Sequence, residues 1–142
     1  MIKHKSVGRI ISCIHRYTQI HLNNKLKCFK IGIGQLNFLM KLYNKDGINQ
    51  ETLAHCLKID KATSARAIYK LEKEGFVLRK KDKIDKRAYK IYLTKKAKDL
   101  QLKIRNITKE WTNILLTDFS EKEKKLLFSF LERIAQNATL FK

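Results

Sequence analysis

Hydrophobic side chains recur mainly three and four residues apart along this chain, which is the spacing of one face of an α-helix. The longest stripe begins at Val7. A second, shorter stripe runs from Leu36 to Tyr43 and ends before a turn at Asp46-Gly47. The chain has no proline and only five glycines, so few residues interrupt these helices. The pattern predicts a mainly α-helical fold. The first and longest stripe comprises Val7, Ile10, Ile11, Ile14, Thr18, Leu22 and Leu26.

Two short helices and a β-hairpin are predicted in the middle of the chain. Asn49 and Asp60 can cap the starts of the two helices with their side-chain oxygens, and Gly75 can end the second helix. The hydrophobic pattern then changes to alternation in segments 76–79 and 88–93, as in β-strands. The charged segment between them predicts the tip of a hairpin.

Two further helices are predicted after Thr94, which can cap the first of them. Ser120 and Glu123 form a capping box for the second. The first of these helices has an apolar stripe from Ala97 to Ile114, which needs a partner helix from the same chain or from a second copy. We expect both kinds of packing. The expected dimer interface comprises Ile10, Ile14, Ile107, Trp111, Ile114, Phe130, Ile134 and Phe141.

The net charge of the chain limits the classes of partner that it can be expected to bind. Its 142 residues, one domain's length, include 32 basic and 13 acidic side chains, a formal charge of +19. This excess favours a polyanionic partner, first of all nucleic acid, although 25 lysines against 7 arginines also fit a lysine-rich composition with solvated charges. No apolar run is long enough for a transmembrane helix or a signal peptide. We therefore expect a cytoplasmic protein without membrane contact.

The second of the two short helices has an outer face whose side chains suit contact with DNA. On the second helix, Ser64, Ala67, Ile68 and Leu71 share one side and should pack inward. The small side chains on the opposite side permit close approach to base edges, and the cationic ones can bind guanine or phosphate in a major groove. Helix, short turn, helix and hairpin together predict a winged helix-turn-helix. The expected DNA contacts on this helix are Lys61, Ala62, Thr63, Ala65, Arg66 and Tyr69.

The hairpin is too basic for a charge-balanced surface. Arg87 lies near its tip, where it could enter a minor groove, and Asp85 on the same strand face could pair with it or orient it. The expected DNA contacts in the hairpin are Arg79, Lys81, Lys83, Asp85, Lys86 and Arg87.

These residues resemble the MarR family of transcriptional regulators. The most specific matches are Leu71-Glu72-Lys73-Glu74-Gly75 and Asp85-Lys86-Arg87, and the resemblance covers nearly the whole chain. It implies a single MarR-like domain over residues 1–142, with a DNA-binding region at 30–94 and a helical dimerisation region at 1–29 and 95–142. It also implies a homodimer that binds a pseudo-palindromic double-stranded DNA operator and usually represses transcription.

The resemblance further implies a small effector. MarR-like proteins commonly release DNA when phenolic or other anionic, hydrophobic compounds bind between the DNA-binding and dimerisation regions. His15 and Arg16 interrupt the apolar first helix and would border such a cleft, where Arg16 could pair with a carboxylate. A surface ion pair or a buried, hydrogen-bonded histidine is the alternative interpretation.

Other classes of function have less support in the sequence. The motifs of phosphate loops, metal hydrolases and activated nucleophiles are missing, so we expect neither an enzyme nor a cofactor or metal site. Cys13, Cys28 and Cys56 are expected to be small buried residues, with oxidant sensing through Cys13 as the alternative. The main competing hypothesis is a winged-helix protein that coats DNA with little sequence preference or binds protein partners.

Overall fold

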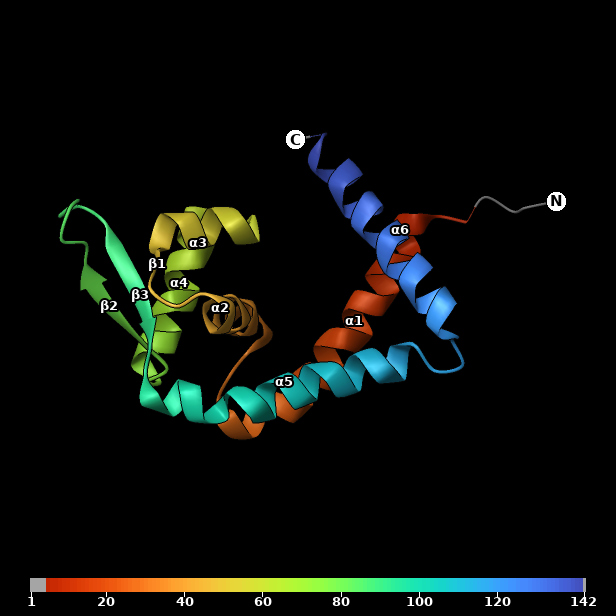
Figure 1. Ribbon diagram of the computed structural model, residues 1–142, viewed down its shortest axis with the longest axis horizontal. Helices are drawn as coiled ribbons and strands as arrows, with labels where there is room; N and C mark the ends of the chain where they lie inside the picture. Colours follow the sequence, from red (N-terminus) through yellow and green to blue (C-terminus); the bar gives the residue numbers. More distant parts are fainter. Residues whose placement is uncertain (1–4, 142) are drawn as a thin grey trace. The chain divides into compact units, whose positions relative to one another are not determined.

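The computed structural model describes residues 5–141 and has the expected mainly helical composition, with a small antiparallel sheet (Figure 1). The chain forms two compact units, one ending at Thr108 and one beginning at Lys109. In chain order the elements are α1 (Val7–Leu26), η1 (Lys27–Phe29), α2 (Ile33–Asn44), β1 (Ile48–Asn49), α3 (Gln50–Leu57), α4 (Lys61–Lys73), β2 (Val77–Lys81), β3 (Tyr89–Leu93), α5 (Lys95–Leu115) and α6 (Glu121–Thr139).

The predicted helix caps are confirmed. Asn49 Oδ1 accepts the N–H groups of Glu51 and Thr52 at the start of α3. Ser120 and Glu123 form the reciprocal capping box of α6. Gly75 ends α4 with φ 79°, a left-handed conformation that favours glycine, and the following N–H of Phe76 donates to Leu71 O. The chain therefore turns directly from α4 into the sheet.

The sheet has one strand more than the predicted hairpin. Its order is β1-β3-β2, with β3 paired antiparallel on both edges. Val77 pairs with Leu93 at the base of the hairpin, and Ile48 of β1 pairs with Ile91 on the other edge. The third strand was missed because two residues are too few to display an alternating pattern. Through β1, the hairpin is joined to the segment that leads into α3.

The core of the first unit lies between helices α2 and α4, the sheet and the start of α5. Leu36, Phe38, Leu39 and Leu42 of α2 are buried against inward residues of α3, α4 and the strands. Ala97 and Ile104 of α5 are fully buried as well. The first part of the predicted α5 stripe therefore packs within the protomer, whereas Ile114 near its end is 47% exposed.

Helices α1 and α6 also present large apolar side chains to solvent. On α1, Ile10 and Ile14 are 50% and 44% exposed. On α6, no residue is buried, and Phe130 and Ile134 are among its exposed apolar side chains. Phe141 lies in a turn after α6 and is also exposed. Within residues 5–141, every helix is too short or too polar to cross a lipid bilayer.

Candidate nucleic-acid interface

The start of α4 is built around Asp60. The turn after α3 places Lys58 in a left-handed conformation, with φ 54°, and the next residue, Ile59, is half-buried. Asp60 then caps α4: its Oδ1 accepts the Thr63 N–H at 2.8 Å and its Oδ2 accepts the Thr63 hydroxyl at 2.7 Å. These hydrogen bonds, with a smaller contribution from Arg66, hold the pKa of the Asp60 carboxyl below its ordinary value. Asp60 is therefore anionic at neutral pH.

The two faces of α4 have the predicted orientation. Ser64, Ala67, Ile68 and Leu71 are buried against the core. The opposite side, which we call the outer face of α4, is exposed over its whole length, and Tyr69 is 63% exposed. Two alanines lie on this face among cationic and hydroxyl groups, which suits close approach to base edges. The outer face comprises Lys61, Ala62, Thr63, Ala65, Arg66 and Tyr69.

The wing, residues 77–93, consists of β2, β3 and the tip 82–88 between them. Its tip is shaped by two carboxylates: Asp82 Oδ1 accepts the Ile84 N–H at 2.9 Å, and Asp85 Oδ1 accepts the Arg87 N–H at 3.0 Å. The Ile84 hydrogen bond holds the pKa of Asp82 below its ordinary value. Arg79, Lys81, Lys83, Asp85, Lys86 and Arg87 are all exposed.

The predicted tip is confirmed, since Asp85 and Arg87 lie between the strands, which end at Lys81 and resume at Tyr89. The expectation that the two residues share a strand face was wrong, because neither belongs to a strand. The hydrogen bond of Asp85 goes to the backbone of Arg87. The carboxylate therefore stabilises the backbone of the tip.

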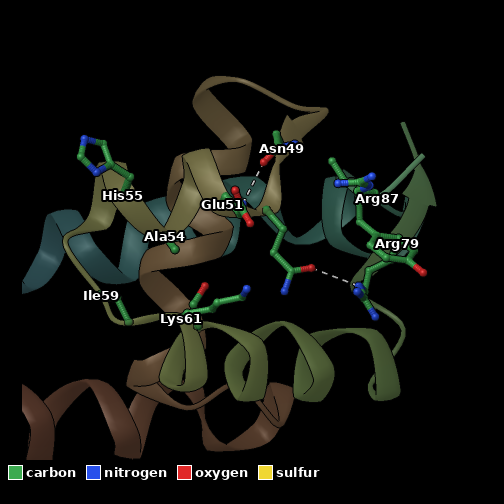
Figure 2. A pocket seen from close by; sticks show the side chains of 12 residues that line it. Asn49, Glu51, Ala54, His55, Ile59, Lys61, Arg79 and Arg87 are labelled. Atoms are coloured by element: carbon green, nitrogen blue, oxygen red, sulfur yellow. Dashed lines mark hydrogen bonds between the residues drawn. The ribbon is translucent and has the colours of Figure 1, made fainter. Parts of the chain in front are cut away.

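A hollow of about 390 Å³ lies between α3, the start of α4 and the wing (Figure 2). Lys61, Arg79 and Arg87 line it, opposed by the single acidic side chain Glu51, so its surface is basic. Arg79 is held in place there, since its Nε donates to Gln50 Oε1 at 3.1 Å and its guanidinium lies 4.1 Å from the centre of the Tyr89 ring. Arg79 thus ties the wing to the first residue of α3.

Gln50 and Tyr89 were not among the predicted site residues. Their partner Arg79 is 29 residues from Gln50 in sequence, and a single glutamine at a helix start carries no signal of such a contact. The basic character of the hairpin was visible in the sequence, but the side chains that orient it were not.

The candidate effector residues lie apart from this hollow. His15 and Arg16 are both exposed on α1, so the alternative of a buried histidine is excluded. Neither residue lines the hollow beside α4.

The expectation of buried cysteines was wrong, since none of the three is fully buried. Cys28 and Cys56 are exposed, and Cys13 is half-buried. Cys28 lies in η1, directly after α1, and Cys56 lies in the last turn of α3. In the part of the chain that the structure describes, no three His, Cys, Asp or Glu side chains are grouped as metal ligands.

Comparisons with known proteins agree with this geometry. The MarR family model matches residues 31–89, which contain α2, α3, α4 and most of the wing. The transcriptional regulator YybA of Bacillus subtilis is 33% identical over 129 residues, covering 91% of this chain and 86% of the relative.

Solved structures extend the similarity to nearly the whole chain. A MarR transcriptional regulator from Methanosarcina mazei is 43% identical and superposes with a TM-score of 0.90, covering 96% of this chain and 98% of that chain. A MarR-family regulator from Listeria monocytogenes, crystallised with a 26-mer DNA, is 31% identical with a TM-score of 0.87, covering 94% of this chain and 89% of that chain. The chain therefore belongs to the MarR family of DNA-binding transcriptional regulators, which are not enzymes.

Proposed function

We propose that this protein is a homodimeric repressor that reads a pseudo-palindromic operator, with the outer face of α4 in the major groove and the wing tip in the adjacent minor groove. The observation that carries the proposal is the outer face itself: Ala62 and Ala65 leave room for base edges beside Arg66, and every member of the face is exposed. The Listeria monocytogenes relative, which was crystallised with DNA, supports binding to a duplex. The protein would act in the cytoplasm, where it meets its DNA.

The wing would supply affinity more than sequence reading. Its cationic side chains surround a tip whose backbone is held by Asp82 and Asp85. Lysine contacts to phosphates carry no sequence information, whereas a bidentate arginine on guanine discriminates between bases. Residues 50–98, which include α4 and the wing, carry 15 basic and 6 acidic side chains, a net charge of +9. Residues 99–142 carry a net charge of only +2.

The test is the ratio of affinities for an operator and for a scrambled duplex, measured at two salt concentrations. The operator is first selected by the protein from DNA flanking its own gene. An operator reader keeps a ratio of at least ~10³ as salt rises, whereas a coating protein loses affinity for both duplexes alike. Arg66→Ala should reduce the ratio, and Lys81→Ala should weaken binding to both duplexes equally. Equal losses for both variants on both duplexes would contradict base reading by α4.

Two copies of α4 are needed to read two successive major grooves, about 34 Å apart. We propose that the second copy binds through the apolar side chains that α1 and α6 expose, since large exposed apolar patches mark interaction surfaces. On α1 these include Ile10 and Ile14, and on α6 they include Phe130 and Ile134. The exposed Ile114 and Phe141 and the half-buried Ile107 and Trp111 complete the proposed interface.

We also propose that a small anionic, aromatic effector releases the operator through His15 and Arg16. Both side chains are exposed on α1, and a guanidinium pairs strongly with a carboxylate. Salicylate and benzoate should lower operator affinity of the wild type and have a weaker effect on Arg16→Ala. Arg9→Ala, which changes another exposed arginine of α1, is the matched control. Unaltered affinity of the wild type at millimolar salicylate and benzoate would remove this proposal.

A further inference from the structure

The outer face of α4 contains a chain of three hydrogen-bonded side chains. Arg66 Nη2 lies 3.1 Å from Thr63 Oγ1, and Thr63 Oγ1 lies 2.7 Å from Asp60 Oδ2. The three residues are spaced three apart, so they follow one another along the same side of the helix, from its cap into its second turn.

The direction of each hydrogen bond follows from the chemistry of the groups. A guanidinium can only donate, and an ionised carboxylate can only accept. The single hydroxyl proton of Thr63 is therefore given to Asp60, and the Thr63 oxygen accepts from Arg66. Thr63 was expected to contact DNA itself, but its proton is already committed to Asp60. The hydroxyl is better suited to holding Arg66 than to donating to a phosphate.

Holding Arg66 matters because an arginine side chain has many rotamers. On an exposed helix face, these rotamers are lost when the side chain binds a base, and the lost entropy weakens binding. One N–H of Arg66 bonded to Thr63 restricts the side chain before DNA arrives. The guanidinium has five N–H donors, so others remain for the two acceptors of a guanine.

We propose that Thr63, fixed by the Asp60 carboxylate, is a positioning residue that determines specificity by holding Arg66 ready for guanine. This inference rests on the proposed base reading by α4. Thr63 acts through Arg66, and Asp60 acts through Thr63. The contribution of Thr63 to sequence discrimination should therefore be confined to the one base pair that Arg66 reads.

Thr63→Val is the central variant, since valine keeps the shape and the backbone N–H of threonine but removes the hydroxyl. Thr63→Ser keeps the hydroxyl and is the matched control. The probes are the operator duplex selected as above and a set in which each G·C pair is replaced by A·T. Arg66→Ala identifies the base pair that Arg66 reads, at which the wild type should discriminate by about 5- to 150-fold. Circular dichroism and thermal unfolding verify that each variant is folded.

At that base pair, Thr63→Val should reduce discrimination by about five-fold, the effect of one hydrogen bond. Discrimination at the other positions, affinity for scrambled DNA and the salt dependence should stay unchanged. Thr63→Ser should retain most of the discrimination, and adding Thr63→Val to Arg66→Ala should change nothing further.

Three results would overturn the inference: unchanged discrimination in Thr63→Val, an equal loss at all positions, or the same loss in the Arg66→Ala background. A different result would overturn the proposed base reading instead. If Arg66→Ala alters discrimination at no base pair while binding persists, α4 does not read sequence through Arg66.

Discussion

At the scale of single residues, carboxylates hold the backbone where the chain changes direction. Asp46 illustrates this, because its Oδ1 accepts two N–H groups, from Gly47 at 2.9 Å and from Leu93 at 2.8 Å. The first bond shapes the turn after α2, and the second ties that turn to the end of β3. Asp60, Asp82 and Asp85 do the same at the start of α4 and in the wing tip.

Asp46→Ala should lower the free energy of unfolding by about 1–3 kcal/mol, because the partly buried N–H of Leu93 loses its acceptor. Urea unfolding followed by circular dichroism measures the change. Asp99→Ala is the control: Asp99 forms an exposed ion pair with Lys95, and its loss should cost about 0–0.5 kcal/mol. Similar losses in both variants would show that Asp46 contributes only as a surface charge.

Tyr43 should make stability depend on alkaline pH. Its hydroxyl donates to Ala97 O, which links α2 to α5, and burial raises the pKa of Tyr43 to about 12, partly offset by Arg105. The folded state therefore holds the phenolic proton more tightly than the unfolded state, whose pKa is about 10. The resulting stabilisation is complete below pH 10 and is lost as pH rises to about 12.

Tyr43→Phe should accordingly be less stable than the wild type at pH 8, by about 1 kcal/mol, and the difference should shrink between pH 10 and 12. Thermal unfolding at a series of pH values measures it. Tyr17→Phe, which changes a tyrosine that is 62% exposed, is the control, and its unfolding temperature should stay close to that of the wild type in this series. A constant difference between Tyr43→Phe and the wild type would contradict the raised pKa.

Residue-scale features were predictable where they depend on near neighbours in sequence. The caps by Asn49, Asp60 and Ser120 were all expected, since each bonds to groups two or three positions along the chain. The contact of Tyr43 with Ala97 spans 54 residues and that of Arg79 with Gln50 spans 29, and no local sequence pattern predicts either contact. The contact of Thr63 with Arg66 is local, three positions apart, but an exposed hydroxyl on a helix face can bond to a neighbour or to DNA, and the sequence does not distinguish the two.

At the scale of elements, the wing is the part whose proposed role depends most on charge. Lys83 and Lys86 lie in its exposed tip. In a complex with DNA, each lysine that neutralises a phosphate releases counterions, so the logarithm of affinity falls more steeply with the logarithm of salt concentration. The wing lysines should therefore be visible in the salt dependence even where they do not affect sequence preference.

Replacing Lys83 and Lys86 together with alanine should reduce the magnitude of that slope by about 4 for the proposed dimer, because two lysines are lost from each protomer and each one that neutralises a phosphate contributes about one unit. Fluorescence anisotropy with operator and scrambled duplexes over a range of salt concentrations gives the slope. As a control, replacing Lys122 and Lys125, two exposed lysines of α6, removes the same charge outside the proposed DNA-binding surface. An equal change in both double variants would mean that the wing acts only through net charge.

Element boundaries followed the sequence closely for the long helices and less well in the sheet. Helices α1 and α6 have long amphipathic patterns, and α6 also has the capping box of Ser120, so both were predicted. Strand β1 has two residues and is defined by hydrogen bonds to β3, more than 40 positions later. Pairing of that kind depends on the folded arrangement of α2 and the wing, which periodicity does not encode.

At the scale of the whole molecule, activity should require two chains. Ile14→Asp and Phe130→Asp each place a charge among exposed apolar side chains, and we expect either variant to shift the protein from dimer to monomer. Sedimentation velocity measures the mass. Ile84→Asp, at the 95% exposed isoleucine of the wing tip, is the control and should stay dimeric. A wild type that sediments as a monomer at micromolar concentration would contradict the proposed assembly.

The double pairing of β3 has a mechanical consequence. Because this strand is bonded to β2 on one edge and to β1 before α3 on the other, the wing cannot tilt without disturbing the helix-turn-helix. With α4 and the tip in neighbouring grooves, as proposed, this pairing keeps the distance between the two DNA-contacting elements nearly constant. The distance between neighbouring grooves changes when a duplex is over- or underwound. We therefore expect operator affinity to depend on the twist of the duplex as well as on its base sequence.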